Sequence, residues 1–250
     1  MKGKKHMLTK NNETILLNNV TKTYGSKTIV ENVSFAVRPG RVTGFLGPNG
    51  AGKSTTLRIL LGIDRPTSGT ALIEGKPYIE HAQPLRTVGA MIDGASAIPE
   101  RRGIDHLSWI AQSNRIPKQR IYEVLETVGL TNAAKMRVRK YSLGMKQRLG
   151  LAAALLGEPR ILVLDEPVNG LDPEGIRTIR GFLREYVQKG NTVLLSSHLM
   201  DETSKIVDDI VIINKGKIIV SGTLDDVNKG YSSLEEAFLG LTGSKGGESW

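Results

Sequence analysis

The sequence has no cysteine, few aromatic residues and no long apolar run. The absence of cysteine among its 250 residues excludes a disulfide framework and any metal site made of thiolates. Aromatic residues make up 5% of the chain, which disfavours rows of stacking platforms for single-stranded nucleic acid. The longest apolar stretches, such as 149–156 and 161–164, are far shorter than the ~20 residues of a transmembrane helix. We therefore expect neither disulfides nor membrane spans.

The composition is that of a folded domain. Hydrophobic residues make up 39% and charged residues 24% of the chain, a balance typical of soluble globular proteins rather than disordered ones. A chain of this length can form one large domain, or a domain with a sizeable subdomain. Residues 1–13 are basic and then polar, without the apolar core of a signal peptide. We therefore expect a cytoplasmic protein.

The formal net charge of +9 has three possible explanations. A basic protein can bind nucleic acid, or it can be attracted to the anionic cytoplasmic face of a membrane. It can also simply have a soluble, basic surface. The basic residues are scattered along the chain, apart from two groups at 115–120 and 135–140. This scatter favours the soluble surface.

The most informative stretch is the glycine-rich segment 47–55, which fits the pattern G-x-x-x-x-G-K-[ST] at every fixed position. It follows an apolar run at 42–46, which predicts a buried strand, and precedes a predicted helix at 56–61. Glycines let several backbone N–H groups converge on one anion, and the following helix adds its positive N-terminal end. The sequence therefore predicts a phosphate-binding loop. The alternative, a glycine turn that binds nothing, is disfavoured by the full pattern and both flanks.

Two side chains of this loop suit a nucleoside triphosphate. Lys53 can reach the β- and γ-phosphates as a point charge, and the Ser54 hydroxyl can ligate Mg²⁺. The predicted nucleotide-binding residues of the loop are Asn49, Gly50, Ala51, Gly52, Lys53, Ser54 and Thr55.

Two carboxylates follow the apolar run 161–164. Ligands of parallel sheets lie at the carboxyl ends of the strands, so Asp165 is predicted to hold Mg²⁺, directly or through a water. Glu166 points elsewhere, because neighbouring strand residues alternate, and is predicted to orient and deprotonate an attacking water. The alternative is a pair of strand-end acids that cap a helix or face solvent.

The remaining pattern predicts an α/β fold. Short strands are predicted at 13–20, 32–39 and 71–74, and we expect those flanking the phosphate loop to form a small antiparallel sheet over the nucleotide. From 93 to 156 the pattern becomes helical, with Trp109 expected in the core. Buried strands at 161–164 and 192–195 then alternate with an amphipathic helix at 175–188, and a hairpin is predicted at 210–220. Such alternation indicates a mostly parallel sheet.

Four further segments occur in an order typical of one family. They are Tyr24, residues 141–147, residues 169–173 and residues 196–198. With the phosphate loop and the Asp165–Glu166 pair, they make the sequence resemble the ATP-binding subunit of an ATP-binding-cassette (ABC) transporter, from about residue 15 to residue 222.

The resemblance implies a P-loop NTPase (RecA-like) core with a small antiparallel β subdomain and a helical signature subdomain. The ATPase domain would span residues 14–222, with the helical subdomain inserted at about 94–156. Residues 223–250 would form a short C-terminal extension with a loose tail.

The resemblance also implies roles for residues outside the phosphate loop. Tyr24 would stack on adenine; on turn composition alone it could be a surface tyrosine. The string 141–147 resembles the family signature L-S-G-G-Q, in which Ser142 and Gly144 would bind the γ-phosphate held by another subunit. Leu143 and Met145 depart from that signature. Ser142 is also a sound helix N-cap on its own.

Three more positions carry roles implied by the family. Residues 169–173 resemble the loop that crosses between subunits, in which Asp172 can also cap a helix. His198 would donate a hydrogen bond to the γ-phosphate and hold the water, completing a catalytic set with Lys53 and Glu166. Asp93 stands where the family has a glutamine; it could still bind Mg²⁺, or it could be a solvent-facing loop acid. Bacteriocin- and antibiotic-exporting relatives also place an acid there.

The function implied is ATP hydrolysis with Mg²⁺ that powers a separate integral membrane permease. Two copies, or one copy and a paralogous ATPase subunit, would close head to tail around ATP at the inner face of the cell membrane. Nucleic acid is not an expected partner, and the transported substrate would be an exported drug, peptide or lipid-like molecule. The alternative is a soluble ABC-type factor acting on the ribosome or DNA, which only the net charge supports. A regulator that binds without turnover would need lost catalytic groups.

Overall fold

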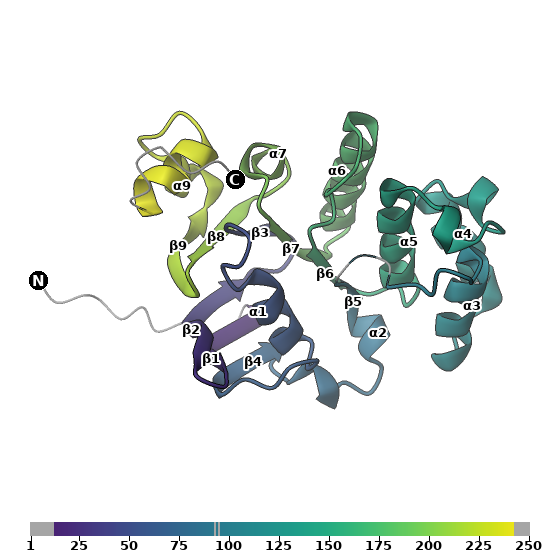
Figure 1. Ribbon diagram of the computed structural model, residues 1–250, viewed down its shortest axis with the longest axis horizontal. Coiled ribbons are helices and arrows are strands. Elements are labelled where there is room, and N and C mark those ends of the chain that lie inside the picture. The colour runs from purple at the N-terminus through teal and green to yellow at the C-terminus, as the bar shows by residue number, and fades with distance from the viewer. Residues whose placement is uncertain (1–12, 93, 95, 243–250) are drawn as a thin grey trace, which may run out of the picture.

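A computed structural model describes residues 13–92, 94 and 96–242 and contains two sheets (Figure 1). A three-stranded sheet has the order β2-β1-β4, and a six-stranded sheet has the order β5-β6-β7-β3-β8-β9. The strands are β1 Ile15–Tyr24, β2 Lys27–Val37, β3 Val42–Leu46, β4 Ser68–Ile73, β5 Val88–Met91, β6 Ile161–Asp165, β7 Thr192–Ser197, β8 Asp209–Asn214 and β9 Lys217–Thr223. The sheets therefore confirm the predicted α/β architecture with a small antiparallel sheet.

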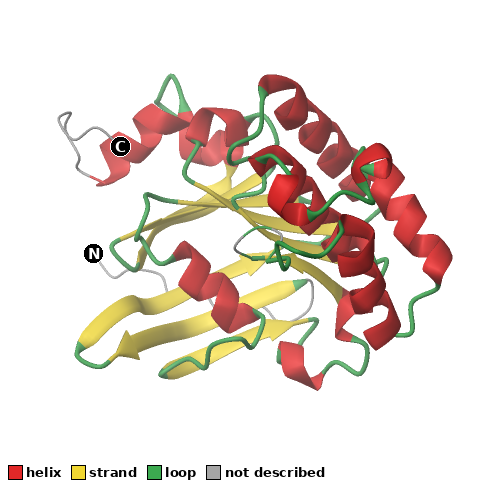
Figure 2. Ribbon diagram, turned by 45° about the vertical axis from the view of Figure 1, so that its right-hand side comes forward, coloured by secondary structure: helices red, strands yellow, loops and turns green. Residues whose placement is uncertain are grey.

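Helices surround the large sheet (Figure 2). They are α1 Lys53–Leu60, α2 Pro84–Thr87, α3 Gly103–Ser113, α4 Lys118–Thr127, α5 Leu143–Leu155, α6 Pro173–Gln188, α7 Met200–Ser204, α8 Leu224–Asn228 and α9 Leu234–Thr242. Short 3₁₀ turns occur at Tyr78–Glu80, Thr131–Ala133 and Val138–Lys140. Within the described part of the chain, no helix combines the length and apolar character needed to cross a membrane.

Successive residues of the large sheet's strands point alternately into two hydrophobic cores, one on each face of the sheet. Leu162 and Leu164 of β6 pack on one face among residues from α3 to α6. Ile161 and Val163 pack on the other face, in a core that also contains Leu57 of α1 and the inner face of the small sheet. Because β6 is buried on both faces, its sequence is continuously apolar, as predicted for a parallel strand.

The small sheet is longer than its sequence pattern indicates. Strand β1 continues to Tyr24, beyond its predicted end at residue 20, and β2 begins at Lys27 rather than at residue 32. Register shifts interrupt the pairing of β1 with β2, and Asn19 and Asn32 have positive φ angles. Each irregularity interrupts the alternation of buried and exposed residues. Because strands are predicted from this alternation, the predicted strands are shorter than the observed ones.

Strand β5 was not predicted, because it has four residues and follows directly on α2. It pairs in parallel with β6, with Val88 opposite Ile161 and Met91 opposite Leu164. It thus leads the chain from the edge of the large sheet into the segment that contains residue 93.

The helices α3, α4 and α5 lie together at one side of the molecule (Figure 1). In α4, the side chains of Ile121, Val124 and Leu125 lie on one face and are buried. The expectation for Trp109 was wrong: its side chain is 58% exposed, and the Arg101 guanidinium lies 5.3 Å from its ring centroid. Trp109 is two residues from the buried Leu107, about 200° around the helix, and so faces away from the core.

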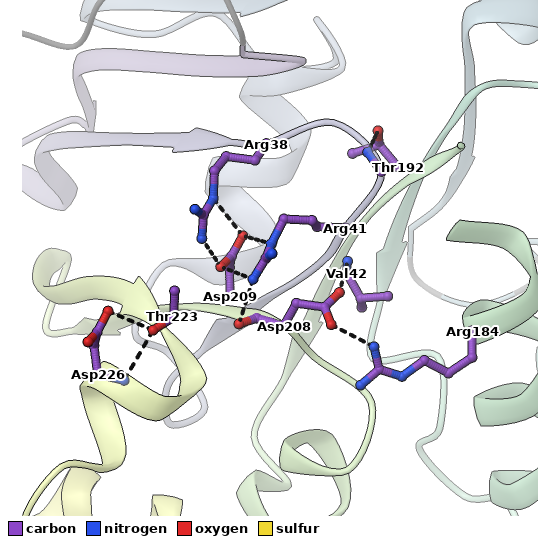
Figure 3. A network of polar contacts seen from close by, with 10 residues as sticks. Arg38, Arg41, Val42, Arg184, Thr192, Asp208, Asp209, Thr223 and Asp226 are labelled. Atoms are coloured by element: carbon purple, nitrogen blue, oxygen red, sulfur yellow. Dashed lines mark hydrogen bonds and ion pairs between the residues drawn. The ribbon is translucent and has the colours of Figure 1, made fainter. Parts of the chain in front are cut away.

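A network of charged side chains joins the two sheets at the end of β3 that is remote from the phosphate loop (Figure 3). Asp209, the buried first residue of β8, accepts a hydrogen bond from Arg38 Nε at 3.0 Å and one from Arg41 Nε at 2.8 Å. The adjacent Asp208 accepts from the Val42 amide at 2.8 Å and from Arg184 Nη1 of α6 at 2.7 Å. The two carboxylates therefore connect the turn after β2, the start of β3, β8 and α6.

We predict that Asp209→Asn destabilises the protein by about 1–3 kcal/mol, because two guanidinium groups lose a shared, partly buried carboxylate. Urea unfolding followed by circular dichroism should show a lower midpoint with an unchanged slope. The matched control is Asp201→Asn at an exposed position of α7, which should leave the midpoint unchanged. Equal midpoints for Asp209→Asn and the wild type would contradict the role of this network.

Candidate functional site

The glycine-rich segment 47–52 forms a tight loop between β3 and α1. Gly52 has φ of 105°, a left-handed conformation that favours glycine, and a Cβ there would lie 2.5 Å from a methyl group of Val30. A Cβ at Gly47 would collide with the carbonyl oxygen of Ile213. The loop can therefore follow this path only with glycine at these positions, and it delivers Lys53 as the first residue of α1.

Lys53 is buried at the centre of this loop, with 6% of its side chain exposed. Its ammonium donates to the carbonyl oxygens of Gly47 at 2.7 Å and Pro48 at 3.2 Å. It also lies 3.4 Å from Glu166 Oε1. The Lys53 ammonium is thus held by two loop carbonyls and a carboxylate.

Glu166 lies between Lys53 and His198. Its second carboxylate oxygen, Oε2, is 2.9 Å from His198 Nδ1. Glu166 and His198 directly follow β6 and β7, and Lys53 begins α1 after the loop that follows β3. These three strands are neighbours in the sheet order β6-β7-β3. The structure therefore brings together the three side chains that we predicted to be catalytic, although 145 positions separate the first from the last.

A turn, rather than strand alternation, sets the direction of Glu166. Strand β6 ends at Asp165, and Glu166 has a positive φ of 50°. Its amide donates to Ser196 of β7, to the carbonyl oxygen at 3.2 Å and to the hydroxyl oxygen at 3.1 Å. Strand β6 therefore ends at Asp165, and the hydrogen bonds to β7 hold the backbone of Glu166 in this turn.

Ser196 connects the two acidic residues. Its hydroxyl donates to Asp165 Oδ1 while its oxygen accepts from the Glu166 amide. In the sequence, Ser196 is only the first residue of the segment 196–198 that contains His198. Its role depends on the register between β6 and β7, in which Asp165 lies opposite Ser196, and a single strand's sequence does not reveal that register.

The two predicted magnesium ligands that the structure describes lie around one cleft of about 430 Å³. Ser54, exposed in the first turn of α1, lines it together with Asp165 and Glu166. The described residues contain no group of three or more His, Cys, Asp or Glu side chains that could hold a metal. Two protein oxygens suit Mg²⁺, which commonly binds through one or two side chains and completes its shell with substrate phosphates and water. Asp93 lies outside the described residues, although its neighbour Gly94 lines the same cleft.

Tyr24, at the end of β1, presents a half-exposed ring that is held by its hydroxyl. The hydroxyl donates to Asp64 Oδ2 at 3.0 Å, and the Lys22 ammonium lies 4.7 Å from the ring centroid. Partial burial raises the pKa of Asp64, but hydrogen bonds from Arg58 and Tyr24 outweigh it, so the pKa lies below its usual value. Asp64 was not predicted, because forty positions separate it from the ring that it orients.

Ser142 and Gly144 lie at the start of α5, away from Lys53. The Ser142 hydroxyl accepts from the Met145 amide at 3.2 Å, which confirms the predicted N-cap. Both residues line a second groove, of about 490 Å³, together with Gly170 and Asp172. Asp172 in turn caps α6 by accepting from the Gly175 amide at 2.8 Å, with Pro173 in the first turn, as predicted. The structure therefore does not bring Ser142 and Gly144 into the cleft of their own chain's Lys53.

His81 and His106, the other histidines among the described residues, do not line the cleft. His81 Nε2 lies 3.0 Å from the carbonyl oxygen of Ile73. His106 is buried in α3, where burial and the nearby Arg101 keep its pKa below the usual value.

Comparisons with known proteins agree with this arrangement. The family model described as "ABC transporter" matches residues 30–169. The chain is 38% identical over 222 residues to the lantibiotic transport ATP-binding protein SrtF of Streptococcus pyogenes, covering 89% of this chain and 94% of the relative. It is 41% identical over 213 residues to the bacitracin transport ATP-binding protein BcrA of Bacillus licheniformis, covering 84% and 70%.

A solved structure described as the ATP-binding subunit of an ABC transporter superimposes with a TM-score of 0.82 at 28% identity. The match covers 92% of this chain and 99% of the other. The chain therefore belongs to the ABC transporter family, as an ATP-binding subunit that hydrolyses ATP to drive transport.

Proposed function

We propose that this chain is the Mg²⁺-dependent ATPase subunit of an exporter and works with a separate membrane-spanning permease. The observation that carries the proposal is the position of Glu166, between the Lys53 ammonium and the His198 ring at the ends of neighbouring strands. This arrangement places a cation, a base and a hydrogen-bonding ring around one point beside a phosphate-binding loop.

Lys53 would bind the β- and γ-phosphates. Its ammonium now contacts two loop carbonyls and Glu166, all weaker partners than a triphosphate. A bound triphosphate would draw the ammonium toward its oxygens, together with the amides at the N-terminus of α1. Glu166 would then lose its cationic partner and become available to a water.

Glu166 would act as the general base. It would accept a proton from a water whose oxygen forms a bond to the γ-phosphorus, while the bond from that phosphorus to the β–γ bridging oxygen breaks. ADP leaves with the electrons of the broken bond, and inorganic phosphate is the second product. His198, which lies against Glu166, would hold the water and the γ-phosphate in line.

Ser54 and Asp165 would hold Mg²⁺, and the Ser196 hydroxyl would keep the Asp165 carboxylate facing the cleft. The metal would supply positive charge that offsets the charge of the transferred phosphoryl group. Asp93, which follows β5 by two residues in the sequence, would be a further ligand.

A second ATPase subunit would complete each site. Ser142 and Gly144 lie at the N-terminus of α5, which attracts anions, yet they line a groove separate from their own chain's cleft. We therefore infer that they bind the γ-phosphate held by a second copy or by a paralogous subunit, in a head-to-tail dimer. Tyr24 would stack on the adenine of its own chain's ATP.

The relatives guide the proposal for the cargo. Two of them are named for transport of bacitracin and of a lantibiotic. We propose that the permease partner exports a related peptide or lipid-like molecule, from a position that keeps this subunit at the inner face of the membrane. Co-purification with an integral membrane protein would support this partner, whereas co-purification with ribosomal RNA would contradict it.

We predict that Glu166→Gln retains ATP binding but slows turnover by about 10²–10⁴-fold, because the amide cannot accept the proton of the water. Light scattering in the presence of Mg·ATP should show a dimer that persists in this variant. Glu185→Gln, at an exposed position of α6, is the matched control and should behave as wild type. Hydrolysis by Glu166→Gln at the wild-type rate would remove the general-base assignment.

We predict that Lys53→Ala weakens ATP binding by about 10- to 100-fold, because hydrogen bonds from a charged group to the phosphates are lost. Calorimetric titration with Mg·ATP measures the change directly. Lys189→Ala, an exposed position just after α6, serves as the control. An unchanged affinity in Lys53→Ala would show that the loop does not bind the triphosphate as proposed.

We predict that Ser196→Ala lowers turnover by about 10- to 100-fold with a smaller change in ATP affinity, because it removes the hydrogen bond to Asp165 and one of the two hydrogen bonds that the Glu166 amide donates. Raising the Mg²⁺ concentration should partly restore the rate. Ser204→Ala in α7, which removes a hydroxyl bonded only to a local carbonyl, is the control. A normal rate in Ser196→Ala would limit this hydroxyl to a structural role.

A further inference from the structure

The start of α5 interlocks with the loop before α6 through two leucine–glycine contacts. The Leu143 side chain occupies the space beside Gly170, where a Cβ would collide with it. In return, Leu171 lies over Gly144, where a Cβ would be 3.1 Å from its Cδ2 atom. Each glycine therefore accommodates a leucine of the other segment, and the two segments cannot slide past each other freely.

Leu143 occupies an unusual position for a large apolar side chain. It is 55% exposed, and it lines both the cleft that contains Ser54 and Glu166 and the groove that contains Ser142. It also stands where the family signature has a glycine, which could not make this contact. Leu143 thus lines both the groove around Ser142, which we propose to contact a second subunit, and the cleft of its own chain.

The loop beyond this contact leads directly to Glu166. The Asn169 amide donates to the Glu166 carbonyl at 3.1 Å, and the Leu171 amide donates to the Val168 carbonyl at 3.3 Å. Glu166 and Gly170 both have positive φ angles, so two tight bends define the segment between them. Gly170 is therefore connected to the backbone of Glu166 through a short and compact loop.

We propose that Leu143 is a positioning residue that couples the two ATP sites of the dimer. The inference rests on the proposed function, because it requires Ser142 and Gly144 to bind the phosphate held by the other subunit. That phosphate would fix the start of α5, Leu143 would then press on Gly170, and the loop would hold Glu166 of the same chain in its working position. ATP in one site thereby promotes hydrolysis in the other.

Mixed dimers test whether Leu143 acts within its own chain. Two differently tagged copies are co-expressed, and dimers that carry both tags are purified in Mg·ATP. One copy always carries Glu166→Gln, so that only the other copy's Glu166 can hydrolyse ATP. Leu143→Ala is then placed either in the Glu166→Gln copy or in the competent copy, and phosphate release is compared with the dimer that lacks it.

We expect Leu143→Ala in the competent copy to lower phosphate release by about fivefold to tenfold, since coupling residues typically have effects of this size. In the Glu166→Gln copy it should leave the rate near the reference. The reverse pattern would overturn the proposal, because it would mean that Leu143 simply contacts the ATP of the neighbouring subunit. Equal rates in both arrangements, or equal losses, would also overturn it.

Further variants separate coupling from a loss of structure. Leu143→Met keeps a long apolar side chain and should retain the wild-type rate, whereas Leu143→Gly should match Leu143→Ala. Leu241→Ala, another exposed leucine, is the control for surface truncation. The affinity of the isolated chain for Mg·ATP should be the same in all of them. A reference dimer that fails to form or to release phosphate would instead contradict the proposed function, and this inference with it.

Discussion

The contacts of Glu166 with Lys53 and His198 depend on the order of the strands in the large sheet. Strands β6, β7 and β3 are neighbours and run in parallel, so their carboxyl ends meet at one edge. Lys53 belongs to the first fifth of the chain's described part, and His198 to the last quarter, yet both reach one carboxylate. Because each of these strands is buried on both faces, the apolar core fixes their register, and the chemistry at the edge follows from that register.

The functional residues that the sequence alone identifies are those that lie close to the end of a predicted strand. Lys53, Asp165 and His198 each lie within a few residues of an apolar run, so a local pattern locates them. Contacts across the fold cannot be found in this way. The bond of Tyr24 to Asp64 and the position of Ser196 between two acids depend on pairings that no local pattern encodes.

Trp109 and the ends of β1 and β2 differ from the sequence-based expectations for local geometric reasons. Trp109 was assigned to the core because aromatic residues are usually buried, but helical geometry turns it away from Leu107. The far ends of β1 and β2 were missed because bulges break their alternation. The residues around Leu143 show a related limit: the departure from the family signature was evident, but its partner, Gly170, became visible only in the folded chain.

Because the Trp109 side chain is exposed, its fluorescence can report on contacts at the protein surface. The sequence contains two tryptophans, and Trp109 lies on the outer surface of α3 beside Arg101. Indole emission shifts to shorter wavelength when water is removed from the ring. Intrinsic fluorescence therefore offers a label-free signal for any molecule that covers this side of the helices, with Trp109→Phe to identify the contribution of this one ring.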